Sequence, residues 1–364
     1  MNTYQQLLST LPAGKQRFTN QHFNSPAEIL HRQECHFSDC TFSNMTLDHA
    51  DWSGLIFERC EINSLHFQAA SLRDCHFIDC CITNCQFSDS TCQEWNSQQT
   101  RWQRCSWQQS RSEMMSFQQG EWQEISLQQC DSRHWNLIEL QIEQFDLQGG
   151  SASDWNLCKC QLTRSRWCEV TLQRQVAAEC QLVAVQLINI AGEAPVWFAC
   201  AWAQSDLSEL TLTGGSFHRN HFSHCNFSQS QLTGTILAEA QLAHCNLQKV
   251  NSSRIQAQKA AFHQCSLSGS VWTNDHLPQA VFEQCEGNDA QFTACDLRGA
   301  QLAGLPATAR LIQSQLHSAA GLPEDVSVSR DPLLDAITAW YHNVQPGPEH
   351  LRHLLKATGA SRYV

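Results

Sequence analysis

Residues 295–304 read Cys-Asp-Leu-Arg-Gly-Ala-Gln-Leu-Ala-Gly, which is two successive units of five residues. Each unit begins with a small residue, has Leu in third place, and is polar or small elsewhere. Stepping back from Leu302 in fives reaches Phe37 with no insertion. Of the 54 centres on this frame, 44 are Phe, Trp, Leu or Ile, so the period belongs to the whole stretch and not to a local motif.

A second inward position lies two residues before each centre. It is mostly Cys, Ala or Ser, and 16 of the 20 cysteines fall there. The other three positions are mainly Gln, Ser, Asn, Asp, Thr and Arg. An α-helix repeats every 3.6 residues and a flat strand every 2.0, so neither gives two inward and three outward residues in five. A chain that turns a corner every five residues does.

This pattern resembles the pentapeptide-repeat family, over residues 35–304. The resemblance implies an all-β fold, a right-handed quadrilateral parallel β-helix with 20 residues per coil. The 270 residues would then make 13.5 coils. At a strand spacing of ~4.8 Å the rod would be roughly 65 Å long. Its open ends would need caps.

The small centres test the coil length. Cys92, Ser112, Ser132 and Ala152 are 20 residues apart, so they predict one column on four successive coils. The next inward position carries a second set of residues at the same spacing: Trp95, Met115, Trp135 and Trp155. A column of small centres beside a column of very large side chains keeps the packed volume constant, as close packing requires.

The frame divides the chain into four parts. Residues 1–34 are predicted to be an N-terminal cap, with a short helix from Tyr4 to Leu11 and an imperfect first coil from Phe18 to Phe23. Residues 35–304 form the β-solenoid, and 305–330 a partial coil and linker. Residues 331–364 are predicted to form a helical hairpin as a short α-helical C-terminal cap. Within the solenoid, Pro195 at an inward position predicts a bulge or protruding loop near 189–196.

The predicted C-terminal helices are amphipathic. Asp331 and Pro332 give an N-cap and a first helical residue, and apolar residues follow at helical spacing. Such helices can cover the open coil, join two copies of the chain as a homodimer, or bind another protein. The candidate partner-binding residues are Leu333, Ile337, Trp340, Tyr341 and Leu354.

No catalytic or cofactor-binding motif occurs in the chain, which predicts a protein that is not an enzyme and needs no cofactor. The cysteines lack zinc-ligand spacing and are expected to be free, with Cys81, Cys158 and Cys168 outward and reactive. His218, His221 and His224 are outward on different sides of a corner, so no metal site is expected.

The composition excludes several classes of protein and predicts the cellular compartment. Twelve Trp and 17 Phe exclude disorder, and no apolar run is long enough to span a membrane. The formal charge of −12 argues against direct binding to nucleic acid. Twenty cysteines without a visible secretion signal predict a cytoplasmic protein.

Two functions fit these observations. The first is a non-catalytic scaffold or adaptor for protein–protein interaction; the family resemblance extends this to an effector-loading or accessory role in a bacterial, type VI-like secretion system. The alternative is a DNA mimic that binds and protects a type II topoisomerase such as gyrase, as some pentapeptide-repeat proteins do. Residues 37–155 have 17 acidic and 6 basic side chains, which favours the mimic locally. A length of ~65 Å of B-DNA carries about 38 charges, so the whole rod would be a weak mimic.

Overall fold

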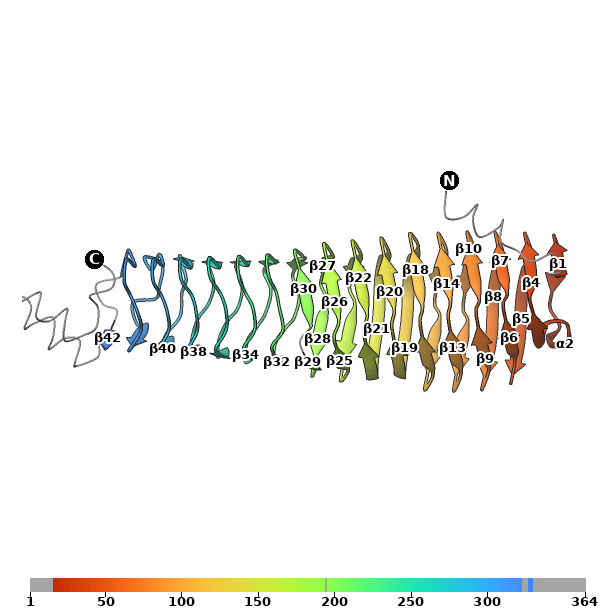
Figure 1. The fold of residues 1–364 in the computed structure, drawn as a ribbon, viewed down its shortest axis with the longest axis horizontal. Coiled ribbons are helices and arrows are strands. Elements are labelled where there is room, and N and C mark those ends of the chain that lie inside the picture. Colours follow the sequence, from red (N-terminus) through yellow and green to blue (C-terminus); the bar gives the residue numbers. More distant parts are fainter. Residues whose placement is uncertain (1–15, 194, 323–326, 330–364) are drawn as a thin grey trace, which may run out of the picture.

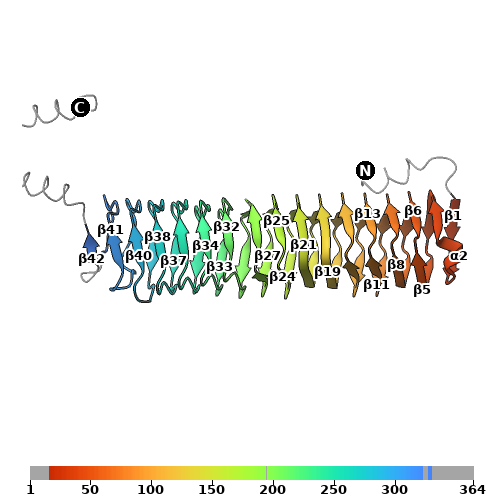
Figure 2. The same cartoon turned by 90° about the horizontal axis from the view of Figure 1, so that it is seen from below.

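The computed structural model describes residues 16–193, 195–322 and 327–329. The described chain is a single rod of stacked coils, with the N-terminal coil at one end and the C-terminal coil at the other (Figures 1 and 2). Paired strands are parallel and 20 residues apart, as in His76↔Asn96 and Asn96↔Ser116. The predicted 20-residue coil is therefore confirmed. Residues 16–320 make about 15 coils, against the 13.5 expected, because both flanks add a coil.

Four five-residue units complete each coil, and the rod therefore has four sides. Face 1 contains every fourth unit counted from Phe37, face 2 from Phe42, face 3 from Leu47 and face 4 from Trp52. Face 1 is a separate ten-stranded sheet. Its strands are β1 (Gln16–Thr19), β4 (Cys35–Ser38), β7 (Ile56–Glu58), β10 (His76–Ile78), β14 (Asn96–Gln98), β18 (Ser116–Gln118), β20 (Asn136–Ile138), β22 (Asn156–Cys158), β26 (Val176–Ala178) and β30 (Val196–Phe198).

The other three faces form one continuous sheet, in which some strands run round a corner. The strands that span two or three faces are β5 (Thr41–Asp48), β8 (Glu61–Gln68), β19 (Glu121–Arg133) and β21 (Gln141–Ser153). Face 2 also has β2 (His22–Phe23), β11 (Cys81–Thr83), β15 (Arg101–Gln103), β23 (Gln161–Thr163), β27 (Gln181–Val183), β31 (Ala201–Ala203), β33 (His221–Ser223), β35 (Gln241–Ala243), β37 (Ala261–His263) and β39 (Val281–Glu283).

Face 3 has β12 (Gln86–Ser88), β16 (Ser106–Gln108), β24 (Arg166–Cys168) and β28 (Gln186–Ile188). Face 4 has β3 (His31–Gln33), β6 (Asp51–Ser53), β9 (Ser71–Arg73), β13 (Thr91–Gln93), β17 (Arg111–Glu113), β25 (Thr171–Gln173), β29 (Ala191–Glu193), β32 (Thr211–Thr213), β34 (Gln231–Thr233), β36 (Asn251–Ser253), β38 (Val271–Thr273), β40 (Gln291–Thr293), β41 (Arg310–Ile312) and β42 (Ser327–Ser329).

Left-handed backbone conformations make the corners. The residue two places after a centre has a positive φ in unit after unit, for example Asp79 at 51° and Met114 at 55°. A non-glycine residue there costs roughly 1–2 kcal/mol. The same residue donates its N–H to the next coil, as Asp79 does to the Gln98 carbonyl over 3.0 Å, so each corner also adds a rung to the ladder.

The predicted columns of small and large side chains are confirmed. Trp95, Met115, Trp135 and Trp155 are all buried beside the small centres. Trp135 and Trp155 stack with their ring centroids 4.7 Å apart and their planes 3° apart. Aromatic centres stack in the same way elsewhere, with Phe57 lying 5.2 Å from both Phe37 and Phe77.

The second inward position has its own hydrogen-bonding rule. At many coils its backbone N–H donates to the side chain of the residue one coil further on and not to a carbonyl. Cys60 donates to Cys80 Sγ over 3.4 Å, Cys80 to Thr100 Oγ1 over 3.3 Å, and Val185 to Ser205 Oγ over 3.2 Å. A small side chain with an acceptor atom is therefore useful there, which accounts for its Cys and Ser content.

The same rule corrects the prediction for residues 189–196. The described residues there contain neither a bulge nor a protruding loop: Ala191 pairs with Thr171 and with Thr211, both in the 20-residue register. Pro195 lies at the second inward position, whose N–H takes no part in the backbone ladder. Its carbonyl still accepts the N–H of Ser216 over 2.8 Å, so proline removes no rung.

The backbone of the rod changes at Asp206. From there on, faces 1 and 3 make only isolated bridges, such as Asn226↔Asn246, and faces 2 and 4 keep their strands. Most units of the altered faces close a tight turn; for example, the N–H of Ala240 donates to the Leu237 carbonyl over 3.0 Å. The sequence frame does not reveal this change, because the inward positions are the same before and after it.

The flanks join the rod through coils one residue shorter. Phe18 pairs with Phe37 and stacks on it at 5.1 Å, and Phe23 does the same on Phe42 at 4.8 Å, each at an offset of 19 residues. Residues 16–34 thus complete a first coil, part of which is the short helix α2 (Pro26–Ile29). The Ile29 carbonyl accepts Trp52 Nε1–H over 2.7 Å.

At the other end, Leu311 pairs with Phe292 and the Ala320 bridge reaches Gln301, so the predicted partial coil is a nearly complete one. The predicted helix from Tyr4 to Leu11 and the helical hairpin of 331–364 lie outside the described residues. Within the described part of the chain, no helix is long and apolar enough to cross a membrane.

Candidate protein-interaction surface

The outward residues of face 1 are the first candidate site. Each unit presents the residues before and after its centre on the flat side of the rod. From Asn96 to Gln258, none of these 18 positions on face 1 is Asp, Glu, Lys or Arg. Strongly charged residues are mostly depleted from the cores of protein interfaces and common elsewhere on a surface, so this face differs from an ordinary solvated one.

An apolar patch lies where this face meets the change in backbone at Asp206. Val176, Val196 and Phe198 expose 41%, 36% and 37% of their surfaces. Along residues 196–203 every outward side chain is apolar, and the row continues from face 1 round the corner onto face 2. We call the following residues the apolar patch: Val176, Ala178, Val183, Val196, Phe198, Ala199, Ala201 and Ala203.

A shallow groove of about 280 Å³ forms the face 2 part of this patch. Ala201 and Ala203 lie outward between larger side chains of the neighbouring coils, including Val183 and His221. Small outward residues leave space that longer ones would fill, and the buried rings of Trp202 and Phe222 lie beneath them. The result is a mostly apolar concave surface on face 2, and the exposed Phe198 lies on the adjoining face 1.

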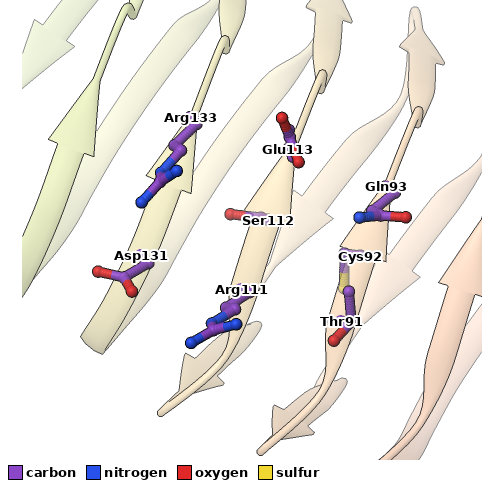
Figure 3. Close-up of a pocket in the computed structure, with 8 residues that line it drawn as sticks. All are labelled: Thr91, Cys92, Gln93, Arg111, Ser112, Glu113, Asp131 and Arg133. Atoms are coloured by element: carbon purple, nitrogen blue, oxygen red, sulfur yellow. The ribbon is translucent and has the colours of Figure 1, made fainter.

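A second depression, of about 290 Å³, lies on face 4 and has the opposite character (Figure 3). Arg111 lies opposite Asp131, and Glu113 lies opposite Arg133, on neighbouring strands, so the sign of the charge alternates both along and between the strands. Cys92 and Ser112 lie at its base, because these centres are small. The depression is polar and carries no net charge from those four side chains.

Several acidic side chains of the rod pair with arginines on a neighbouring coil. Arg59 binds Asp39 at 2.8 Å, Arg101 binds Glu121 at 2.8 Å and Arg219 binds Glu239 at 2.7 Å. The hydrogen bonds from Arg59 and Arg219 hold the pKa values of Asp39 and Glu239 below their ordinary ranges. Such exposed pairs add little to stability, but they interrupt any continuous row of negative charge.

The thiol predictions are confirmed in part. All 20 cysteines are free, and the column of Cys225, Cys245, Cys265 and Cys285 is buried. Cys81 and Cys158 are half-buried at outward positions, as expected. Cys168 is a correction: only 6% of it is exposed, and Arg166 reaches over it with Nη2 3.7 Å from Sγ.

The three histidines do not converge. His218 Nδ1 lies 2.8 Å from the Ala238 carbonyl, and His224 stacks instead on His244, one coil further on, at 4.7 Å. Within the described residues no group of three or more His, Cys, Asp or Glu side chains is placed to hold a metal ion. Leu333, Ile337, Trp340, Tyr341 and Leu354, the predicted partner-binding residues, lie outside the described part of the chain.

The sequence analysis missed the apolar patch and the uncharged stretch of face 1 from Asn96 to Gln258, although the sequence contains a signal for both. Reading only the two outward positions of every fourth unit isolates face 1 and reveals the run without charge. Reading the outward residues of one coil, from Val196 to Ala203, reveals the patch.

The sequence matches the model of pentapeptide repeats, in eight copies, over residues 35–74, 203–237 and 235–271. No curated protein matches it significantly. Among solved structures, QnrB1, a plasmid-mediated fluoroquinolone resistance protein, is 14% identical over 54% of this chain and 100% of its own, with a TM-score of 0.26.

HetL, a pentapeptide-repeat protein involved in heterocyst differentiation regulation in the cyanobacterium Nostoc, is 17% identical over 88% of this chain and 92% of its own, with a TM-score of 0.22. A mannuronic acid-specific family 6 polysaccharide lyase from human gut microbiota is 9% identical over 94% of this chain and 100% of its own, with a TM-score of 0.30. With identities and TM-scores this low, these structures do not indicate the function of this chain. The matching repeat segments, together with the five-residue frame and the register of 20, show that the chain belongs to the pentapeptide-repeat family.

Proposed function

We propose that this protein is a non-catalytic scaffold that binds another protein through the apolar patch on faces 1 and 2. The observation that carries the proposal is the run of outward residues from 196 to 203, all apolar, on a rod whose other sides are largely polar. A contiguous exposed apolar patch on a protein of this size is typical of an interaction site.

The chemistry of the patch indicates the kind of partner. Phe198 is an exposed aromatic ring on the same strand as Val196, between Ala178 and His218 on the neighbouring coils, and such aromatic anchors often contribute most to binding energy. The uncharged surroundings on face 1 cannot form ion pairs, so a partner with an apolar, weakly charged surface loses least on desolvation. An amphipathic helix or a flat apolar strand edge has that character.

Two parts of this proposal extend beyond the described surface. The predicted C-terminal helices, with Trp340 and Tyr341, would supply a second binding element or a homodimer contact. A cytoplasmic location fits twenty free thiols, because a reducing compartment keeps them unpaired. The narrower role, loading effectors onto a type VI-like secretion system, rests on the family resemblance alone.

The DNA-mimic alternative has one observation in its favour, the net charge of −11 over residues 37–155. The placement of these charges counts against it. Mimicry of a phosphate backbone needs rows of unpaired negative groups. Here Arg59 and Arg101 pair with acids on adjacent coils, and face 1 from Asn96 to Gln258 has no Asp, Glu, Lys or Arg at its outward positions. Gyrase binding is therefore the second candidate.

The test is quantitative affinity purification of the full chain from its source cell, comparing wild type with Phe198→Asp. Phe198 points outward, and so does Ile188, which provides the control, so circular dichroism should show an unchanged fold for a variant at either position. Ile188→Asp is the matched control: Ile188 follows its centre as Phe198 does, but lies half-buried on face 3. We expect partners to be lost with Phe198→Asp and retained with Ile188→Asp.

Two outcomes would reject the scaffold surface. If both variants retain every partner, the patch does not bind. If gyrase subunits are retained equally by wild type and both variants, and the chain alters supercoiling in a purified assay, the mimic replaces the scaffold.

A further inference from the structure

The charges along one corner of the rod reverse their signs about a midpoint. This corner joins face 1 to face 2 and is made by the residues two places after each face 1 centre, which have a positive φ. Over seven successive coils, the corner residues are Glu139, Lys159, Glu179, Ala199, Arg219, Glu239 and Lys259. Counted outward from Ala199, each acidic residue in one direction corresponds to a basic residue in the other.

A row of charges with this symmetry is complementary to its own reverse. When two copies of the rod lie antiparallel, with a two-fold axis at the coil of Ala199, Glu179 of each copy faces Arg219 of the other. Lys159 then faces Glu239, and Glu139 faces Lys259. A two-fold interface repeats each contact, so each of these pairs forms twice. All three are pairs of opposite charge, which is what specific recognition at an interface requires.

The opposite corner of face 1 raises no objection to this arrangement. Asp154 and Arg174 form an ion pair with each other there. About the same axis they would meet Gly234 and Gly214, which have no side chains. Like charges therefore do not meet at these positions either.

Face 1 itself can be covered without burying an unpaired charge. From Asn136 to Gln258, the seven coils centred on Trp197, none of its outward positions is Asp, Glu, Lys or Arg. In the same part of the rod, face 2 carries Glu143 and face 3 carries Asp146. Two chains with a formal charge of −12 each repel one another at most orientations, and a buried charge without a partner is costly. Face 1 is the side that avoids both penalties.

The apolar patch lies at the axis. Val196 and Phe198 are the exposed residues of β30, on the same coil as Ala199, so each faces its own counterpart in the second copy. Ala178 faces His218, which places a small side chain opposite a larger one. An apolar centre surrounded by a polar, charged rim is the usual composition of a protein interface.

We propose that two copies of this chain associate antiparallel through face 1, about a two-fold axis at the coil of Trp197 and Ala199. The proposal rests on the proposed function for the role of the apolar patch, and it names a second copy as the partner of the face 1 part of that patch. The axis runs along the strands of face 1 toward face 2. It therefore leaves the face 2 groove of each copy open and places both grooves on the same side of the pair, where the scaffold can hold two equivalent sites for another protein.

The size of the contact predicts a reversible dimer. The rod is straight over this length, so the two copies can stay in contact along it (Figures 1 and 2). Seven coils cover about 34 Å, and a side of five residues is about 16 Å wide. Two such surfaces together bury about 1,100 Å², which is at the lower end of specific interfaces.

The first test cross-links the full chain in a background of Cys81→Ser and Cys158→Ser, which removes the half-buried native thiols. Ala199→Cys places a thiol at the axis. A bismaleimide with a spacer of about 10 Å, the distance between packed sheets, should then join two copies. Ala184→Cys is the matched control: Ala184 is also a half-buried corner alanine with a positive φ, but it lies between faces 2 and 3.

We expect cross-linked dimers from position 199 and few from position 184. A contact made by the C-terminal segment alone would not produce this difference. Equal cross-linking at the two positions, or none at either, would overturn the proposal.

The second test reverses a corner charge and measures the dissociation constant of the dimer by analytical ultracentrifugation. Glu179→Lys would face Arg219 of the other copy at two symmetric places, and should raise the dissociation constant roughly tenfold. Adding Arg219→Glu restores opposite charges and should recover affinity. Glu169→Lys is the control, because Glu169 is an exposed corner residue between faces 3 and 4. Equal constants for wild type and Glu179→Lys, or equal weakening by Glu169→Lys, would overturn the proposal.

Failure of this dimer and failure of the scaffold surface give different results. A full chain that stays monomeric and still loses its partners with Phe198→Asp would reject the dimer and leave the scaffold surface standing. A chain that cross-links at position 199 but retains every partner with Phe198→Asp would support the dimer and reject the scaffold surface.

Discussion

The backbone N–H of Ile255 donates a hydrogen bond to Oδ1 of Asp275, one coil further along, over 2.9 Å. The second carboxylate oxygen accepts the hydroxyl of Ser252 over 2.6 Å. Asp275 occupies the second inward position, where Cys and Ser serve the same purpose at other coils. Here the acceptor carries a titratable group, 1% exposed, and burial raises the pKa of Asp275 to about 6.

Asp275→Asn should remove a pH dependence from stability. Because the folded pKa lies above the unfolded one, the native state holds the proton more tightly. The resulting stability is complete below about pH 4, falls as pH rises, and is lost above about pH 6; it amounts to roughly 3 kcal/mol. Asn keeps an oxygen for the Ile255 N–H without ionising. We expect the variant to match wild type near pH 4 and exceed it at pH 8, measured by urea unfolding.

The contradictory outcome for Asp275 is a constant difference between the two proteins across that pH range. Asp48→Asn serves as a control, because Asp48 is exposed on face 3 and its loss changes the net charge equally.

Trp135→Ala should destabilise the rod by roughly 3–5 kcal/mol, because the column of small centres beside it leaves no side chain able to fill the space. Trp135 is 1% exposed and stacks on Trp155. Chemical unfolding followed by circular dichroism measures the change. Met114→Ala, at a corner just before the coil beneath Trp135 and with 47% exposure, should be nearly neutral. An unchanged midpoint for Trp135→Ala would mean that the column is not packed as described.

The parts of the fold that could be predicted from the sequence are those set by the five-residue repeat. An inward position repeats its chemistry at every unit, so the register and the Trp135 column could be read directly from spacing. The tolerance of Pro195 could not, because it depends on which N–H groups the ladder uses. The burial of Cys168 was also missed, since it depends on the conformation of Arg166 and not on its outward place in the frame.

The candidate site was harder to predict for a related reason. Apolar residues at helical spacing drew attention to the C-terminal segment. The outward apolar residues from Val196 to Ala203 alternate with inward apolar residues that the repeat already explains, so they do not stand out in the linear sequence. Their significance depends on adjacency between coils and round a corner. Neither is visible until outward residues are arranged in columns.

Thiol reactivity should separate two cysteines from the rest. Cys81 and Cys158 are half-buried, and the other 18 are buried, several with pKa values raised by burial, such as that of Cys295 to about 12. Titration of the native protein should find about two fast thiols, and about 20 after unfolding. Cys81→Ser with Cys158→Ser should abolish the fast phase. Rapid labelling of Cys168 in that double variant would contradict its burial beneath Arg166.

Deletion of residues 331–364 should leave the rod folded and remove self-association or one class of partner. Above Leu302, the coil that contains Leu311 and Ala320 pairs with the coil below it, and both Leu302 and Leu311 are fully buried. The deleted segment carries Leu333, Ile337 and Leu354. Trp340 and Tyr341 are adjacent, so on a helix their side chains would point about 100° apart. They could not both enter one narrow groove. One of the two aromatic residues should then face outward as an anchor.

Circular dichroism would follow the fold of the truncated chain, and light scattering with affinity purification would follow its association. Trp340→Ala in the full chain is the finer variant, since it keeps the predicted helices and removes one anchor. Aggregation or unfolding of the truncated rod would make the segment an essential cap. The truncated chain could instead be folded and keep every partner, with both it and the full chain monomeric. That result would assign recognition to the apolar patch around Phe198 alone.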